Sequence, residues 1–218
     1  MSRAVLTINS RNYGAWSLRG WLLCQFTGLD VEVVQVPADD PDSRAELTFL
    51  SPSFQVPRLD HDGVRVWGLL SIAEYLNEIC PDAGLLPKNR PERALCRSVC
   101  SEVHSGFMNL RTALPMNLRV RHANFPVWQG AQADIDRVTE VWQLCLETSG
   151  GPLLFGDSPT MADAMYAPEC TRFRSYGVAL PPECAAYRDA VLALPELVEW
   201  TTLAANEPDE VEELDIEF

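Results

Sequence analysis

The first third of the chain alternates strand-like and helix-like patterns of apolar residues. Residues 4–8 are apolar and rich in β-formers, and residues 31–36 alternate apolar and polar side chains as a strand does. Between them, residues 16–26 carry the apolar side chains of a buried helix. Gly28 is placed to end this helix, and Pro37 ends the second strand. This order predicts a βαβ unit.

A short helix, a hairpin and a longer helix are expected next. Residues 42–49 predict the short helix, and residues 55–67 predict two strands that turn at residues 60–63, Asp-His-Asp-Gly. Residues 69–79 repeat apolar side chains at helical spacing. The pattern therefore predicts an α/β domain of the order βαβ-α-ββα over residues 1–80.

A proline-bearing linker at residues 81–87 separates this domain from a region in which only helical spacing occurs. The helices expected there cover residues 90–114, 133–148, 161–176, 182–192 and 195–205. The second domain, residues 88–206, is thus expected to be all-helical.

The chain ends in an acidic tail, residues 207–218, which holds seven of its acidic groups. We expect this tail to be solvated, because a run of like charges repels itself. Leu214, Ile216 and Phe218 alternate with the acids, so a weakly docked strand or helix end is the alternative.

The net charge of −14 excludes some classes of partner. It would repel the phosphates of nucleic acid, so no nucleic-acid binding is expected. No run approaches the roughly 20 apolar residues of a membrane span, and the first residues lack the features of a signal peptide. We therefore expect a cytoplasmic protein with no membrane partner.

Seven cysteines are present, an odd number, without a Cys-x-x-Cys motif. Most lie in apolar, helix-like surroundings, where a free cysteine behaves as a small buried hydrophobe. Cys96, Cys100 and His104 follow one another at four-residue spacing. One helix face does not supply the tetrahedral surroundings that zinc requires, so no metal site is expected.

Three short motifs stand out across the chain. Residues 12–19 read Asn-Tyr-Gly-Ala-Trp-Ser-Leu-Arg, residues 55–57 read Gln-Val-Pro before the expected hairpin, and residues 156–164 read Gly-Asp-Ser-Pro-Thr-Met-Ala-Asp-Ala. In the last motif Thr160 and Asp163 have the spacing of a capping box, so we expect them to act in folding.

Together these motifs resemble the glutathione transferase superfamily, and residues 12–19 are similar to the "NYSSWSLR" segment of a bacterial branch. The resemblance implies a thioredoxin-like first domain, an all-helical second domain, a homodimer, and glutathione as co-substrate. It also implies that Gln55 and the backbone at Val56 and Pro57 bind glutathione, with a cis peptide bond before the proline.

The sequence departs from the family at the position that activates the thiol. Two serines of the related branch are replaced here by Gly14 and Ala15. A hydroxyl at the start of the first helix donates to the glutathione sulfur and lowers the pKa of the thiol. The remaining candidate donors are the side chains of Ser17, Tyr13 and Asn12 and the backbone amides of Ala15 and Trp16. Of these, Ser17 is expected to bond locally, and Tyr13 to pack.

A second departure lies at the start of the helix over residues 69–79. The family has an acid followed by serine there, which bind the γ-glutamyl end of glutathione, whereas this chain has Gly68 and Leu69, with Ser71 two residues later. Leu69 cannot form those hydrogen bonds, and a charged ligand group left unpaired binds weakly.

The helical half carries polar residues where the family binds its co-substrate: His104, Arg111, Asn117 and Arg172. Arg172 and Phe173 resemble the Arg-Phe of the zeta class, the maleylacetoacetate isomerases, in which the arginine binds a substrate carboxylate. A guanidinium matches a carboxylate in a bidentate fashion. The alternative for each arginine is a salt bridge within the protein.

Two classes of function follow and both stay open. The first is a glutathione transferase or zeta-like isomerase that acts on a small, carboxylate-bearing electrophile. The second is a protein that kept the fold and lost glutathione, and acts as a binding or regulatory module or as a glutathione-independent enzyme.

Overall fold

The computed structural model describes residues 4–36, 56–122 and 125–208. The predicted helix at residues 42–49 and the candidate ligand Gln55 lie outside the described residues.

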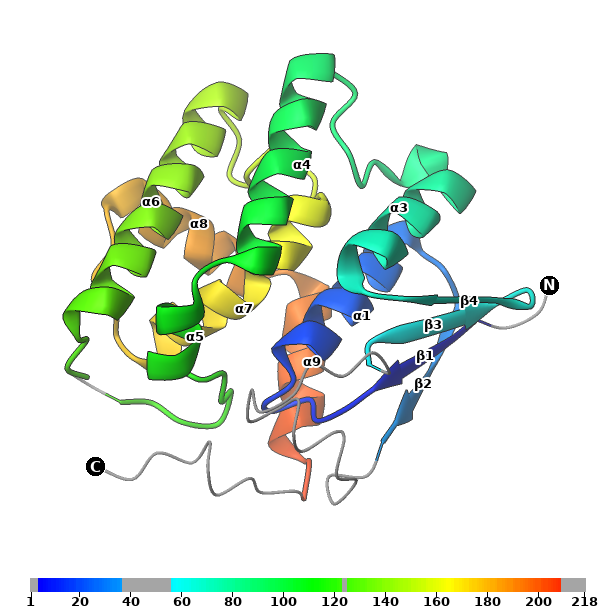
Figure 1. Cartoon of the computed structure of the whole chain (residues 1–218), viewed down its shortest axis with the longest axis horizontal. Coiled ribbons are helices and arrows are strands. Elements are labelled where there is room, and N and C mark those ends of the chain that lie inside the picture. The colour runs from blue at the N-terminus through cyan, green and yellow to red at the C-terminus, as the bar shows by residue number, and fades with distance from the viewer. Residues whose placement is uncertain (1–3, 37–55, 123–124, 209–218) are drawn as a thin grey trace.

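A four-stranded sheet forms the centre of the first half (Figure 1). Its strands are β1 (Ala4–Ile8), β2 (Val31–Gln35), β3 (Arg58–His61) and β4 (Val64–Trp67). They lie in the order β2-β1-β3-β4, with β1 parallel to β2 and antiparallel to β3. The βαβ unit and the hairpin predicted from the sequence are therefore confirmed.

Two helices complete this half. Helix α1 (Ala15–Thr27) connects β1 to β2, and helix α3 (Leu69–Ile79) follows the hairpin and packs against α1. Gly28 ends α1 in the left-handed conformation, as its position in the sequence predicts. The cis Val56–Pro57 bond expected from the resemblance is present. Pro57 packs closely against α1, since a Cβ atom added at Gly20 would lie 2.8 Å from Pro57 Cβ.

The described part of the second half is helical. After a 3₁₀ turn, η1 (Pro81–Ala83), come α4 (Arg90–Ser105), α5 (Met108–Ala113), α6 (Gln129–Ser149), α7 (Met161–Ser175), α8 (Pro182–Leu192) and α9 (Pro195–Ala205). The prediction of one helix over residues 90–114 was wrong, because Gly106 is extended and Phe107 adopts a left-handed φ of 61°. This break separates α4 from α5.

Helix α7 lies at the centre of the molecule and is buried along almost its whole length. It packs against α1, α4 and α8, and α9 also passes beside α1 (Figure 1). One hydrophobic core therefore includes residues from both halves. The tryptophans Trp21 and Trp200 meet across this boundary with ring centroids 5.2 Å apart.

The start of α7 has the capping box predicted from the sequence. The Thr160 amide donates to Asp163 Oδ2 at 2.8 Å, and the Leu154 amide donates to Asp163 Oδ1 at 3.1 Å. Asp163 is fully buried and so holds both the helix start and the preceding turn. Its interactions are those of a folding residue, as expected.

Candidate active site

The loop from Asn9 to Gly14 joins the central strand β1 to the start of α1. Within it, the Gly14 amide donates to the Ser10 carbonyl and the Ala15 amide to the Tyr13 carbonyl, both at 3.0 Å. Leu18 is the first residue whose amide donates to a helix carbonyl, that of Gly14. The amides of Trp16 and Ser17 therefore have no acceptor within the helix.

These two amides form the positive end of the α1 dipole, where an anion is stabilised. Of the two backbone donors considered from the sequence, Ala15 is occupied by the turn and Trp16 is free of the helix ladder. A sulfur placed at the start of α1 would receive its hydrogen bond from Trp16 rather than from a side-chain hydroxyl.

The Ser17 hydroxyl is engaged within the protein. It donates to Asn9 Oδ1 at 2.6 Å and accepts the Asn9 amide at 3.1 Å, and the side chain is fully buried. The local bonding expected for Ser17 is confirmed, and its hydroxyl is engaged in the β1–α1 loop.

The loop requires glycine at position 14, where the related branch of the family has a serine. A Cβ atom at Gly14 would lie 2.2 Å from Asn9 Oδ1 and 2.2 Å from the Ser10 carbonyl oxygen. No side chain fits there without movement of the backbone, so the loop of this chain excludes the serine of the related branch.

Asn12 and Tyr13 connect the loop to the helical half. Asn12 Nδ2 donates to Asn117 Oδ1 at 3.0 Å, and Asn12 Oδ1 accepts the Leu118 amide at 2.9 Å. Tyr13 is buried, with the Arg119 guanidinium 5.9 Å from its ring centroid. The structure thus places Asn117, a predicted substrate residue, in a buried contact between the two halves.

The predicted glutathione ligands near the cis proline differ in exposure. Val56 is buried, and Leu69 is only 1% exposed, with its side chain in the core. Ser71 is exposed at the start of α3. The Ile72 amide donates to the Gly68 carbonyl, so the amides of the first helical residues have no intrahelical acceptor. Backbone groups and Ser71, but not the Leu69 side chain, are available to a ligand carboxylate.

Arg172 lies in a buried ion network, which is the alternative expected from the sequence for each arginine. Arg19 Nη2 donates to both carboxylate oxygens of Glu169 at 2.8 Å, and Arg172 Nη1 donates to Glu169 Oε1 at 3.2 Å. Arg172 Nε donates to the Leu114 carbonyl at 2.9 Å, and the residue is 1% exposed. Burial lowers the pKa of Arg172 to about 10, which leaves it charged at neutral pH.

The network had a signal in the sequence. Arg19 is the one charged residue of α1, and Glu169 lies between Pro168 and Cys170 in a buried part of α7. A charged residue in a helix buried on all sides requires a partner of opposite charge.

Two guanidinium groups and an imidazole surround the ring of Trp16. The guanidinium groups of Arg19 and Arg111 lie 4.8 Å and 4.9 Å from its ring centroid, and His104 meets the ring edge-on at 5.2 Å. Arg111 is 3% exposed and donates to the Val103 carbonyl. Trp16 is the second residue of α1, and its side chain is partly exposed. These groups therefore lie next to the start of α1.

Two polar atoms of this group lack partners. Among the described residues, Arg111 Nε and His104 Nδ1 are buried and have no hydrogen-bond partner. Burial and the charges of Arg19 and Arg111 lower the pKa of His104, so its imidazole is neutral at neutral pH. Burial also lowers the pKa of Arg111 to about 9. Both atoms are buried, and a ligand would reach this group from the partly exposed side chains of Trp16 and His104.

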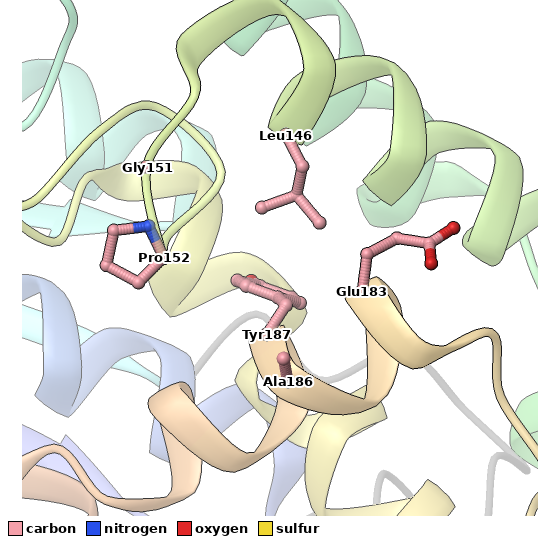
Figure 2. Close-up of a pocket in the computed structure, with 6 residues that line it drawn as sticks. All are labelled: Leu146, Gly151, Pro152, Glu183, Ala186 and Tyr187. Carbon is pink, nitrogen blue, oxygen red and sulfur yellow. The ribbon is translucent and has the colours of Figure 1, made fainter.

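The described pockets do not include the predicted site residues. Figure 2 shows one of about 190 Å³ between α6 and α8, lined by Leu146, Gly151, Pro152, Glu183, Ala186 and Tyr187. Another, of about 440 Å³, lies between α1, β2 and α9. Neither brings together groups that would carry out chemistry.

The cysteines behave as core residues, as the sequence indicates. Cys80 is partly exposed and the other six are buried. Burial raises the pKa of Cys24 and of Cys145 to about 12, so these thiols stay protonated. Among the described residues, no group of three His, Cys, Asp or Glu side chains could hold a metal ion. No helix in this part of the chain is long and apolar enough to cross a membrane.

A thioredoxin-like domain with a cis proline, followed by a helical domain that packs on its first helix, defines the two-domain class of glutathione-binding transferases. Family models agree: the glutathione S-transferase N-terminal domain matches residues 13–79, and the C-terminal domain matches residues 122–201. The chain belongs to the glutathione S-transferase superfamily.

Similar proteins point to one branch. Maleylacetoacetate isomerase of Rattus norvegicus is 29% identical over 183 residues, 83% of this chain and 82% of that protein. The crystal structure of maleylacetoacetate isomerase from Anaeromyxobacter dehalogenans, with glutathione in its active site, is 25% identical, with a TM-score of 0.69 over 96% of this chain and 99% of that one. A glutathione-bound transferase homolog from Burkholderia, 22% identical with a TM-score of 0.71, covers 94% of this chain and 99% of that one and supports the fold.

Proposed function

We propose that the protein is a glutathione-dependent enzyme that transfers glutathione to, or isomerises, a small electrophile bearing a carboxylate. The observation that carries this proposal is the start of α1, where the Trp16 amide has no acceptor in the helix and the ring of the same residue faces Arg111 and His104. The similarity to maleylacetoacetate isomerases over most of the chain supports the same reaction class.

The α1 amides perform the first step. Their partial positive charge stabilises the thiolate of bound glutathione over the thiol and so lowers the pKa of the thiol. The thiolate then adds to an activated carbon. In an isomerisation, the carbon–carbon bond that has become single rotates, and elimination releases the same thiolate. In a transfer, the new carbon–sulfur bond remains, and the electron pair displaced by the addition either takes up a proton or expels a leaving group such as chloride, so that the product leaves as a conjugate.

The Trp16 group supplies the second binding element. Arg111 Nε lacks a partner, whereas Arg172 is tied to Glu169 and to the Leu114 carbonyl. We therefore assign the substrate carboxylate to Arg111 in place of Arg172. The neutral imidazole of His104 is placed to accept a hydrogen bond or a proton from the substrate.

The superfamily supports a proposal about the assembly. We propose a cytoplasmic homodimer in which residues 1–80 and 88–206 form the two domains and residues 81–87 the linker. Light scattering of the purified protein measures its mass in solution, and a monomer would contradict this part of the proposal.

Calorimetric titration of glutathione tests the central claim. We expect binding, a higher melting temperature at millimolar glutathione, and turnover of maleylacetone. If glutathione produces neither heat nor stabilisation, the second candidate holds: a fold that has lost glutathione. The buried side chain of Leu69 and the absence of room at Gly14 are the observations that favour that candidate.

A further inference from the structure

Glu207 does not belong to a solvated tail. It follows α9, is 7% exposed, and inserts its carboxylate beneath the loop that leads into α1. The sequence-based expectation was wrong at this residue because its partners lie about 200 positions earlier in the chain, where no local pattern reveals them.

The carboxylate of Glu207 accepts hydrogen bonds from several loop groups. Its Oε2 accepts the Ser10 hydroxyl at 2.7 Å and the Asn12 amide at 2.8 Å. Its Oε1 accepts the Arg11 amide at 3.0 Å and the side-chain amide of Gln35. A buried carboxylate with this many donors is well satisfied, and each bond to a charged acceptor is stronger than one between neutral groups.

The loop depends on this carboxylate for its own conformation. The amides of Arg11 and Asn12 donate to Glu207, and the Tyr13 amide donates to the Ser10 hydroxyl at 3.0 Å, which in turn donates to Glu207. The Gly14 amide is satisfied without Glu207, because it donates to the Ser10 carbonyl. Three of these four amides thus take their positions from Glu207, directly or through Ser10.

The same loop determines where the amides of α1 point. Gly14 supplies the first helix carbonyl, and the free amide of Trp16 follows two residues later. A shift of the loop by a fraction of an ångström would move this donor relative to a bound sulfur, and hydrogen-bond strength falls steeply with distance and angle.

We propose that Glu207 is a positioning residue, which fixes the loop from Ser10 to Gly14 and so aims the α1 amides at the sulfur of glutathione. The inference rests on the proposed function for its ligand, but the link between Glu207 and the loop is independent of any ligand. It makes a residue just beyond the last helix a determinant of thiol activation in the other half of the chain.

The variant Glu207→Gln tests this role, because it keeps the size of the side chain and replaces one acceptor oxygen by a donor. Glu199→Gln is the matched control: it removes the same charge from an exposed position on α9. Hydrogen exchange at the amides of Arg11 and Asn12 reports the loop, and the pH profile of kcat/KM for glutathione reports the thiol.

We expect exchange at these two amides to accelerate about tenfold or more in Glu207→Gln, as the loss of a hydrogen bond to a charged group implies. The acid limb of the pH profile should move to higher pH, because a poorly aimed amide lowers the thiol pKa less. Core amides in α7 and the profile of Glu199→Gln should stay as in the wild type.

Unchanged loop exchange in Glu207→Gln would overturn the inference, as would faster exchange spread evenly over the core, which marks a general stabilising role. If Glu207→Gln does not fold, Ser10→Ala removes a single donor and should accelerate exchange at Tyr13. A wild-type protein without glutathione turnover would contradict the proposed function, while the exchange measurement still decides whether Glu207 holds the loop.

Discussion

Gly14 and Ala15 are adjacent in the sequence, yet a serine should destabilise the protein at the first position and improve catalysis at the second. At Gly14 its Cβ atom would meet Asn9 Oδ1 and the Ser10 carbonyl at 2.2 Å. Gly14→Ser should therefore lower the free energy of unfolding by about 3 kcal/mol, as overpacking does. Urea denaturation of the two variants measures this difference, and a Gly14→Ser protein as stable as the wild type would show that the loop adapts.

Ala15→Ser should instead improve catalysis. It places a hydroxyl at the start of α1 beside the free amides, where a hydrogen bond to a thiolate raises kcat/KM for glutathione by roughly tenfold. Ala15 is buried, so the added hydroxyl should lower the free energy of unfolding by about 1 kcal/mol, less than the loss expected at Gly14. An equal or lower kcat/KM at every pH would place the sulfur away from this position.

The sequence identified both residues as departures from the serines of the related branch, but not the reason. The exclusion of a side chain at Gly14 depends on where the Asn9 side chain and the Ser10 carbonyl lie. Those positions follow from contacts with Ser17, eight residues from Asn9, and with Glu207, 197 residues from Ser10. The chemistry of this site could be predicted from its residue types, whereas the available space could not.

Substitution of Arg111 should weaken the binding of a substrate that carries a carboxylate. Arg111→Met removes the guanidinium with an unpartnered Nε, so KM for maleylacetone should rise about tenfold, the loss expected for one hydrogen bond to a charge. KM for chlorodinitrobenzene, which has no carboxylate, serves as the internal control and should not change. A parallel rise for both substrates would remove Arg111 from carboxylate recognition.

At the scale of elements, α1 and α7 are joined by the pairing of Arg19 and Arg172 with Glu169. Glu169→Gln would leave two buried guanidinium groups without a carboxylate, so the free energy of unfolding should fall by about 3–5 kcal/mol. Urea denaturation measures this loss, and Glu147→Gln, at an exposed position of α6, is the control. A loss below about 1 kcal/mol would mean that water or a shifted side chain replaces the carboxylate.

The elements themselves were largely predictable. Apolar residues and capping residues located α1, α3, α7, α8 and α9. Helix α3 buries one face whose spacing is visible in the sequence, whereas α7 is buried on nearly all sides. The break between α4 and α5 was not predicted. Phe107 holds a left-handed conformation with its side chain buried in the core. Gly106 marks a possible helix end, but the residue types do not show that the next residue takes this conformation.

At the scale of the molecule, the two halves are joined through polar links as well as apolar packing. Asn12 bonds to Asn117, Arg19 to Glu169, and Glu207 to the β1–α1 loop. Each link connects residues more than 100 positions apart. Sequence periodicity reports only neighbours, which explains why the two-domain order was predicted while the contacts between the domains were missed.

These links should make the chain unfold as one cooperative unit. If the halves separated, Arg19 and Glu169 would each lose a buried partner, and the apolar contact between Trp21 and Trp200 would open. An intermediate with one half folded is therefore unfavourable, and urea unfolding should give coincident curves by tryptophan fluorescence and by far-ultraviolet circular dichroism. In Glu169→Gln one of these penalties is removed, so the two curves should begin to separate. Two well-resolved transitions in the wild type would show instead that each half is stable alone and that the polar links add little to the packing between α1 and α7.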